Sequence, residues 1–333
     1  MEFPFEKRKY EIIKRAEEKT NPAWGKAPEQ RTIQELLEYG VIILNKSQGP
    51  TSHQAVDTVK KILNLDKAGH SGTLDPNVTG VLVIALGKAT RVVEVLLTGG
   101  KEYICLMHLH TPVDEDLIKK TFKDYMGKIE QMPPKKSAVK RQLRTREIYY
   151  LDILEMNGQD VLFKVGCEAG TYIRTLCVDL GKKLNSRGHM QELVRSRVCT
   201  FTDQEWISLH DLKDASEDYK EGNETSLKKI LLPFERAVAH IPKIWISDFA
   251  VDSIAHGAFL SVPGIIKLHS DIEVGDRVAL LSLKGELIGI GQAKMNSQNM
   301  FKQEKGIAVG ETKVFIEPGV YPKYKKNEGK DTV

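Results

Sequence analysis

The sequence predicts an α+β protein, in which a larger mixed part is followed by a small β-barrel-like domain. Residues 81–86 form an uninterrupted apolar run, which is typical of a strand buried on both faces. Between Ala55 and Leu63 the apolar residues recur with the helical period. Beyond Pro242 short β segments alternate with Gly and Pro pairs, which is the pattern of a small barrel of ~80 residues.

The first elements of the larger part follow from capping and stop signals. Residues 40–63 predict a strand, a turn and a helix, because Thr51 and Gln54 can form a capping box at the helix start. A second, short helix should end at Gly99-Gly100. The alternation over 102–113 then predicts another strand.

The later elements of this part include a hairpin. Asn157-Gly158 lies between two alternating apolar runs and favours a type I′ turn. Helical spacing begins at Tyr172. The acidic segment 211–224 is poor in core residues, so we expect an exposed loop or a domain edge there.

Composition shifts divide the chain into four segments. The polar residues 1–40 suggest an arm laid against the body of the protein. Residues 41–241 form the larger domain and residues 242–322 the β-rich domain. The basic end, residues 323–333, is expected to be disordered.

The overall composition is that of a soluble, cytoplasmic protein. Of the 333 residues 41% are hydrophobic and 28% charged. No stretch approaches the roughly 20 apolar residues of a membrane helix, and the charged start lacks a signal-peptide core. The four cysteines have no CxxC spacing, so we expect buried thiols and neither a disulfide nor zinc.

One segment concentrates positive charge, although the formal net charge is only +4. Residues 135–146 carry six cations and no acid. A solvated loop is the plain interpretation, but crowded cations repel one another, and this favours a polyanionic partner such as nucleic acid. The six are Lys135, Lys136, Lys140, Arg141, Arg144 and Arg146.

Four side chains are candidates for chemistry. Asp75 follows a Gly-Thr-Leu approach and precedes the buried strand 81–86, so its position should be rigid. Tyr172 and Arg174 lie two residues apart at a strand-to-helix junction, and Arg174 could hold a carboxylate in place. The alternatives are turn formation for Asp75, sheet packing for Tyr103 and a surface ion pair for Arg174.

Neither a metal nor a nucleotide cofactor is indicated. His108 and His110 share a strand face, but no third ligand has a suggestive spacing, so packing or hydrogen bonding is the better interpretation. The sequence contains neither G-x-G-x-x-G nor GK[ST] after a strand. Any reaction should therefore run on side chains.

Several motifs together resemble one enzyme family. GPTSH, GHSGTLDPNVTGVL, KEYICLMHLH, PPKKSAVKR and EAGTYIRTL occur in the order found in TruB-type pseudouridine synthases. They are most similar to the dyskerin-like branch of H/ACA ribonucleoproteins, and the short basic tail resembles the archaeal members. SIAHGAFLSVPGI, KGIAV and YPK resemble a PUA domain. The resemblance implies a catalytic domain with a central mixed or antiparallel sheet flanked by helices.

The resemblance also implies roles for matching residues. Asp75 would be the catalytic aspartate, Arg174 would pair with it, and Tyr172 would line the pocket and assist proton transfer. Tyr103 would stack on the target base, His53 would handle substrate RNA, and Leu193 would form an apolar wall. Guide RNA would bind at the PUA positions His256, Gly257, Ala258, Lys305 and Gly306. The family usually has Asp-Lys-Pro where this chain has Asn45-Lys46-Ser47.

The implied reaction is the isomerisation of uridine to pseudouridine in rRNA or tRNA, without metal or cofactor. Implied partners are a guide RNA, the substrate RNA and three small ribonucleoprotein proteins. Whether Asp75 forms a sugar adduct or removes a sugar proton stays open. So do two alternatives: a stand-alone enzyme for the tRNA T-loop, and a non-catalytic RNA scaffold.

Overall fold

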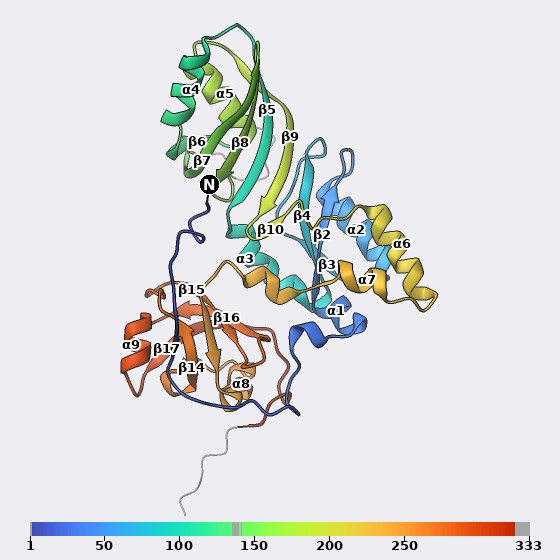
Figure 1. Cartoon of the computed structure of the whole chain (residues 1–333), viewed down its shortest axis with the longest axis vertical. Coiled ribbons are helices and arrows are strands. Elements are labelled where there is room, and N and C mark those ends of the chain that lie inside the picture. Colours follow the sequence, from blue (N-terminus) through green and yellow to red (C-terminus); the bar gives the residue numbers. More distant parts are fainter. Residues whose placement is uncertain (1, 135–139, 141, 324–333) are drawn as a thin grey trace, which may run out of the picture. The chain divides into compact units, whose positions relative to one another are not determined.

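The computed structural model describes residues 2–134, 140 and 142–323 (Figure 1). These residues divide into two compact units, of which the first contains residues 2–7 and 36–237. The second contains residues 8–35 and the described residues from 238 onward. Most of the predicted arm therefore belongs to the C-terminal unit. The predicted limits at residues 40, 241 and 322 stay predictions.

A ten-stranded sheet organises the first unit (Figure 1). Along it the order is β11 (Leu232–Pro233), β2 (Gly40–Lys46), β4 (Thr79–Leu86), β9 (Gly188–Val198), β5 (Lys101–Leu109), β8 (Asp160–Cys167), β7 (Arg144–Asn157) and β6 (Gly127–Gln131), with β3 (Ala68–His70) on β4 and β10 (Phe201–Thr202) on β9. β4 pairs with β9 in parallel, whereas β2 with β4 and β5 with both β8 and β9 are antiparallel. The sheet is mixed, as the resemblance implies.

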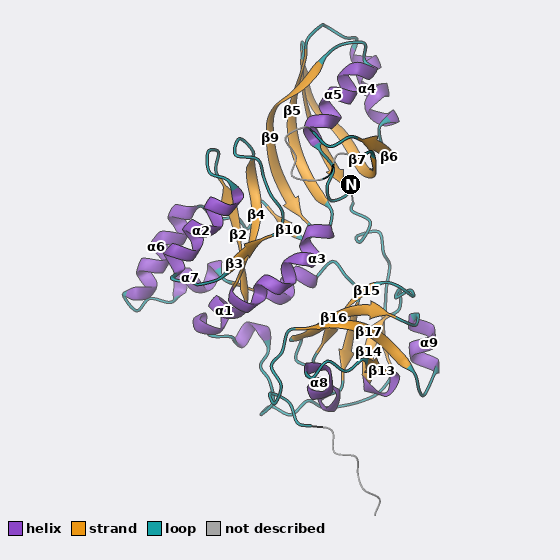
Figure 2. Cartoon of the chain, turned by 180° about the vertical axis from the view of Figure 1, so that it is seen from behind, coloured by secondary structure: helices purple, strands orange, loops and turns teal. Residues whose placement is uncertain are grey.

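Helices flank this sheet (Figure 2). They are α2 (Ser52–Leu63), α3 (Val93–Thr98), α4 (Glu115–Asp124), α5 (Ile173–Lys183), α6 (Leu209–Lys220) and α7 (Thr225–Ile230), with the 3-10 turns η2 (Gly87–Val92) and η3 (Phe234–Val238). Phe122 of α4 packs edge-on against Phe163 of β8 with ring centroids 5.3 Å apart. Helix α5 joins the same core through Leu176 and Leu180. All four cysteines are buried.

The elements nearest the site match the sequence prediction. Residues 81–86 of β4 are fully buried, as their apolar run indicates. Helix α2 begins after Thr51, whose side chain accepts from the backbone of Gln54 while the Gln54 side chain accepts from the Thr51 backbone. This capping box fixes the start of α2.

Two local predictions are wrong. Residues 209–220 form α6 instead of a loop, because Ser208 and Asp211 make a capping box and Leu212 and Ala215 supply a buried face. The hairpin exists, but its turn is Gly158-Gln159, between the paired Asn157 and Asp160. Gly158 has a φ of +61° while Gln159 stays outside the left-handed region. A type I′ turn requires positive φ at both central residues, so the turn is not type I′.

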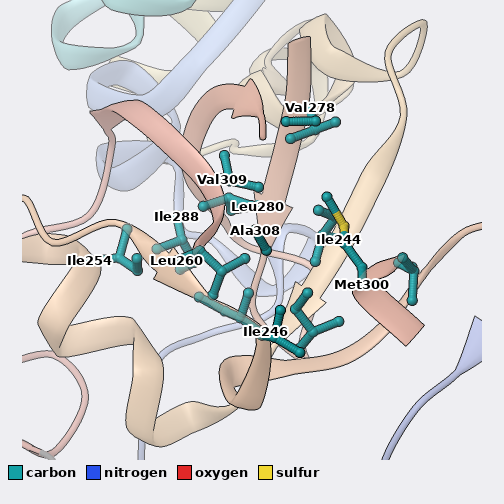
Figure 3. Close-up of a cluster of buried hydrophobic side chains, with 14 of the residues drawn as sticks. Ile244, Ile246, Ile254, Leu260, Val278, Leu280, Ile288, Met300, Ala308 and Val309 are labelled. Carbon is teal, nitrogen blue, oxygen red and sulfur yellow. The ribbon is translucent and has the colours of Figure 1, made fainter. Parts of the chain in front are cut away.

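The second unit contains a seven-stranded sheet. Its order is β1 (Ile12–Lys14), β14 (Ile265–His269), β12 (Lys243–Ile246), β15 (Arg277–Leu281), β16 (Leu287–Ala293), β17 (Ile307–Val314) and β13 (Leu260–Ser261), with α8 (Asp248–Ala255), α9 (Ser297–Lys302) and the 3-10 turns η1 (Pro28–Gln30) and η4 (Val262–Gly264). Helix α1 (Ile33–Tyr39) contains the point where the chain passes from this unit to the first. Ile246, Leu280 and Ile288 lie in the apolar core of the second unit (Figure 3).

Residues 8–35 are an integral part of this second unit. Strand β1 pairs antiparallel with β14. Arg8 donates to the carboxylates of Asp271 at 2.5 Å and Asp276 at 2.7 Å. In the described part of the chain, no helix is both long and apolar enough to cross a membrane.

The parallel contact of β4 with β9 depends on Gly80, and this can be tested. A Cβ at Gly80, where φ is +109°, would overlap the backbone of Arg195. Gly49 has the same φ of +109° and open space around it. We predict that Gly80→Ala lowers the free energy of unfolding by about 2 kcal/mol more than Gly49→Ala, since both carry the same backbone strain and only Gly80 adds the overlap. Denaturant titration of both variants measures this, and equal losses would contradict it.

Candidate active site

A cavity of about 620 Å³ opens in the first unit between β5, β9, the start of α5 and the loop that leads into β4. Five of the predicted site residues line it. They are Asp75, Tyr103, Tyr172, Arg174 and Leu193. Residues up to 118 positions apart in sequence, Asp75 and Leu193, therefore meet at one place. His53 is not among the lining residues; its ring meets that of His70 at 5.0 Å between centroids.

The backbone on both sides of Asp75 is held by buried side chains. Before it, Ser52 of α2 both receives a hydrogen bond from the Leu74 amide, at 2.8 Å, and donates to the Leu74 carbonyl, at 3.1 Å. After it, the Lys46 ammonium donates to the carbonyls of Pro76 at 3.3 Å and Val78 at 2.9 Å. Lys46 and Ser52 are 1% and 0% exposed. They make the Asp75 loop rigid.

The Asp75 carboxylate forms an ion pair with the Arg174 guanidinium. Both side chains are about half exposed, at 54% and 49%. Arg174 lies in the first turn of α5, two residues after the N-cap residue Tyr172. The pair joins the loop before β4 to the start of α5.

Gln131 holds the start of α5 in place. It is buried at the end of β6. Its side-chain amide accepts from the Tyr172 backbone N–H at 3.0 Å and donates to the Tyr172 carbonyl at 3.2 Å. This two-fold contact holds Tyr172 and, through α5, the neighbouring Arg174.

Tyr103 and Leu193 come from adjacent strands. Tyr103 on β5 pairs with Arg195 on β9, and Leu193 lies two residues before Arg195. Leu193 and Arg195 therefore face the same side of the sheet. Burial raises the pKa of the Tyr103 phenol, so the hydroxyl stays protonated near neutral pH.

Two cations at this cavity were not predicted from the sequence as site residues. Arg195 is 1% and Lys101 5% exposed, and both line the cavity. Burial lowers the pKa of both groups, that of Lys101 to about 8. Neither follows a distinctive spacing, and only the pairing of β5 with β9 brings them together.

The structure describes part of the basic segment. Lys135, Lys136 and Arg141 lie outside the described residues. Arg144 donates to the Lys140 carbonyl at 3.5 Å, and Arg146 forms an ion pair with Glu168 at 3.3 Å. Pro134, which immediately precedes the segment, lines the cavity.

The predicted guide-RNA residues lie in two segments of the second unit. His256, Gly257 and Ala258 follow α8, while Lys305 and Gly306 precede β17. The amide of Val262, in the 3-10 turn η4 beyond the first of these segments, donates to the Gly306 carbonyl at 2.9 Å.

His108 on β5 and His110, which directly follows this strand, are both hydrogen bonded, as the sequence analysis favours. His108 contacts the Asp160 carboxylate at 2.7 Å, and His110 contacts His189 at 3.0 Å. Within the described residues, no group of three or more His, Cys, Asp or Glu side chains is arranged to hold a metal.

Comparisons with known families cover most of the chain. Residues 60–173 match the TruB family pseudouridylate synthase (N terminal domain), and residues 174–239 match the tRNA pseudouridylate synthase B C-terminal domain. A PUA domain matches residues 242–314, and a DKCLD (NUC011) domain matches residues 1–56.

Relatives and solved structures agree with these matches. Proteins named probable tRNA pseudouridine synthase B are 53% identical in Pyrococcus abyssi, over 94% of each chain, and 50% identical in Methanopyrus kandleri, over 96% of this chain and 95% of that one. A Cbf5-Nop10-Gar1 complex contains a chain with a TM-score of 0.92 and 52% identity, covering 96% of this chain and 98% of its own. An H/ACA ribonucleoprotein bound to a substrate RNA containing 2′-deoxyuridine contains one with a TM-score of 0.91 and 50% identity, covering 97% and 99%.

Lys101 should make the stability of the protein depend on pH. Its pKa is about 8 in the folded chain against an ordinary 10.5, so the unfolded chain binds a proton there that the folded chain lacks. The free energy of unfolding should therefore rise as pH increases from about 8 to about 10.5. Lys101→Met should lack this rise. Denaturant titrations of both proteins at several pH values measure it, and a constant difference between them would contradict it.

Proposed function

Because the chain belongs to the TruB family of pseudouridylate synthases, we propose that it isomerises uridine to pseudouridine in rRNA, tRNA or both, as the catalytic subunit of an H/ACA guide ribonucleoprotein. The observation that carries the proposal is the Asp75–Arg174 ion pair at a cavity lined by two tyrosines. A rigid carboxylate beside an aromatic pocket suits a reaction at the sugar of an extruded nucleotide.

The reaction rearranges one nucleotide without an external reagent. The bond between N1 and C1′ breaks, the uracil turns within the cavity, and C5 bonds to C1′. C5 then loses its proton and N1 gains one, so that substrate and product have the same atoms. Asp75 acts at the sugar, either as a nucleophile on C1′ or as a base, and Arg174 keeps its carboxylate oriented.

The other lining residues receive the base. The uridine leaves its stack before it reacts, which costs a few kcal/mol, and stacking on the Tyr103 ring offsets part of this cost. Tyr172 lines the pocket and assists proton transfer, and Leu193 provides an apolar wall. His53 lies outside the cavity lining, and we assign it to the RNA strand that leads into the site. The cations of residues 135–146 bind its phosphates.

The guided form of the reaction is supported by the second unit and by the solved relatives. The PUA match, residues 242–314, would anchor guide RNA at His256, Gly257, Ala258, Lys305 and Gly306. Related chains are described in complexes with Nop10, Gar1 and substrate RNA. By extension this chain assembles with three small proteins, a guide RNA and its target in the cytoplasm.

A stand-alone reaction on tRNA is the second candidate, because the curated relatives are named as tRNA pseudouridine synthases. Mass-labelled pseudouridine mapping distinguishes the two. The purified chain is incubated with rRNA and tRNA, with and without guide RNA and the small proteins. Pseudouridine at guide-complementary positions only in the complete mixture supports the guided form, and T-loop modification by the chain alone supports the second candidate.

Asp75→Asn separates an enzyme from a non-catalytic scaffold. The change preserves shape but removes the negative charge. We predict that RNA binding stays within about tenfold, or 1.4 kcal/mol, while pseudouridine formation falls below detection. Asp66→Asn, at an exposed residue, is the control and should retain turnover. Turnover by Asp75→Asn at the control rate would refute the catalytic assignment.

A further inference from the structure

The charge of the cavity is unbalanced. Among the described residues that line it, Asp75 is the one carboxylate, against the cations Lys101, Arg174 and Arg195. Arg174 is paired with Asp75. In the described residues no carboxylate forms an ion pair with Lys101 or Arg195. Two buried positive charges therefore remain.

Backbone carbonyls hold both cations in place. Arg195 donates through Nε to the Val81 carbonyl at 2.8 Å and through Nη2 to the Gly72 carbonyl at 3.0 Å. Lys101 donates to the carbonyls of Leu96, Leu97 and Gly99, each at 2.8 Å. These dipoles stabilise the cations in part, but they do not neutralise them.

Arg195 also lies beside the aromatic residue of the site. It is paired with Tyr103 across β5 and β9, so the two side chains project from the same face of the sheet as neighbours. A guanidinium remains charged at physiological pH even when it is buried. Burying a charge without a counterion is costly. Because the fold buries these two cations without one, the cavity next to Tyr103 has a fixed positive potential.

We propose that Arg195 stabilises the negative charge that the uracil carries while it is detached from the sugar, with Lys101 adding to the same field. When the N1–C1′ bond breaks, its electron pair leaves on the uracil, which becomes an anion spread over N1 and two carbonyl oxygens. The pair enters the new C5–C1′ bond when the ring has turned. Charges arranged before the reaction stabilise such a species without reorganisation. Arg195 acts by its field, from its place beside Tyr103.

This inference rests on the proposed function, and a structural role for Arg195 is the alternative, since Arg195 also ties β9 to β4. The two differ in their dependence on the leaving group. Fluorine at C5 makes uracil a weaker base, so the fluorouracil anion needs less stabilisation. Loss of an electrostatic effect should slow uridine more than 5-fluorouridine, whereas a distorted site should slow both alike.

The test is single-turnover consumption of uridine and of 5-fluorouridine at the same RNA position, using the full chain in the assembly that is active for wild type. Arg195→Gln should slow uridine about a hundredfold or more, as loss of an oxyanion donor does, and 5-fluorouridine about tenfold or less. Arg195→Lys should keep the wild-type ratio of the two rates. The matched control is Lys46→Met, which removes a buried cation that holds the Asp75 loop but does not line the cavity. It should slow both substrates equally.

A second pair of variants changes the charge without touching the buried hydrogen bonds. Leu97 lines the cavity and is 45% exposed. Leu97→Glu should slow uridine relative to 5-fluorouridine, and Leu97→Gln, of the same size, should not. The inference is overturned if Arg195→Gln slows both substrates equally. If that variant does not fold, the inference is overturned when Leu97→Glu and Leu97→Gln give the same ratio of the uridine rate to the 5-fluorouridine rate. A wild-type chain that converts neither substrate would instead contradict the proposed function, and the inference with it.

Discussion

The contact on which the site depends is the ion pair between Asp75 and Arg174. It joins the loop that enters β4 to the first turn of α5, two segments 99 residues apart in sequence. An ion pair this exposed contributes about 0–1 kcal/mol to stability. Its value lies in geometry, because it directs a reacting carboxylate into a cavity that also contains the tyrosines.

Buried polar side chains hold the backbone on which this geometry depends. Ser52 and Lys46 hold the backbone before and after Asp75, and Gln131 holds Tyr172 at the start of α5. Because each of these groups is buried and hydrogen bonded to backbone, the exposed pair rests on a rigid support. The loop that carries Asp75 also accepts a hydrogen bond from Arg195 at the Gly72 carbonyl. The buried cation and the reacting carboxylate are therefore positioned by the same loop.

The sequence predicts most elements near the site because their signals are local. The apolar run of β4 and the capping box of α2 are each readable within a few residues. Helix α6 was missed because its acidic composition conceals a narrow buried face formed by Leu212 and Ala215. The turn after Asn157 differs because strand pairing places the tight turn one residue later.

The residues of the site also divide into those with a local sequence signal and those without one. Asp75, Tyr103, Tyr172 and Arg174 were candidates from their setting, and family resemblance added Leu193. Ser52, Gln131 and Arg195 carry no local signal for their contacts. Each acts through partners 22 to 123 positions away, which only the fold reveals.

The central claim is that Arg174 holds Asp75 for catalysis, and single-turnover pseudouridine formation by Arg174 variants tests it most directly. The account predicts that Arg174→Ala loses turnover to roughly the level of Asp75→Asn while RNA binding stays within about tenfold. Arg174→Lys, which keeps the charge but loses the planar fork, should retain a measurable fraction. Turnover by Arg174→Ala at the wild-type rate would contradict the claim.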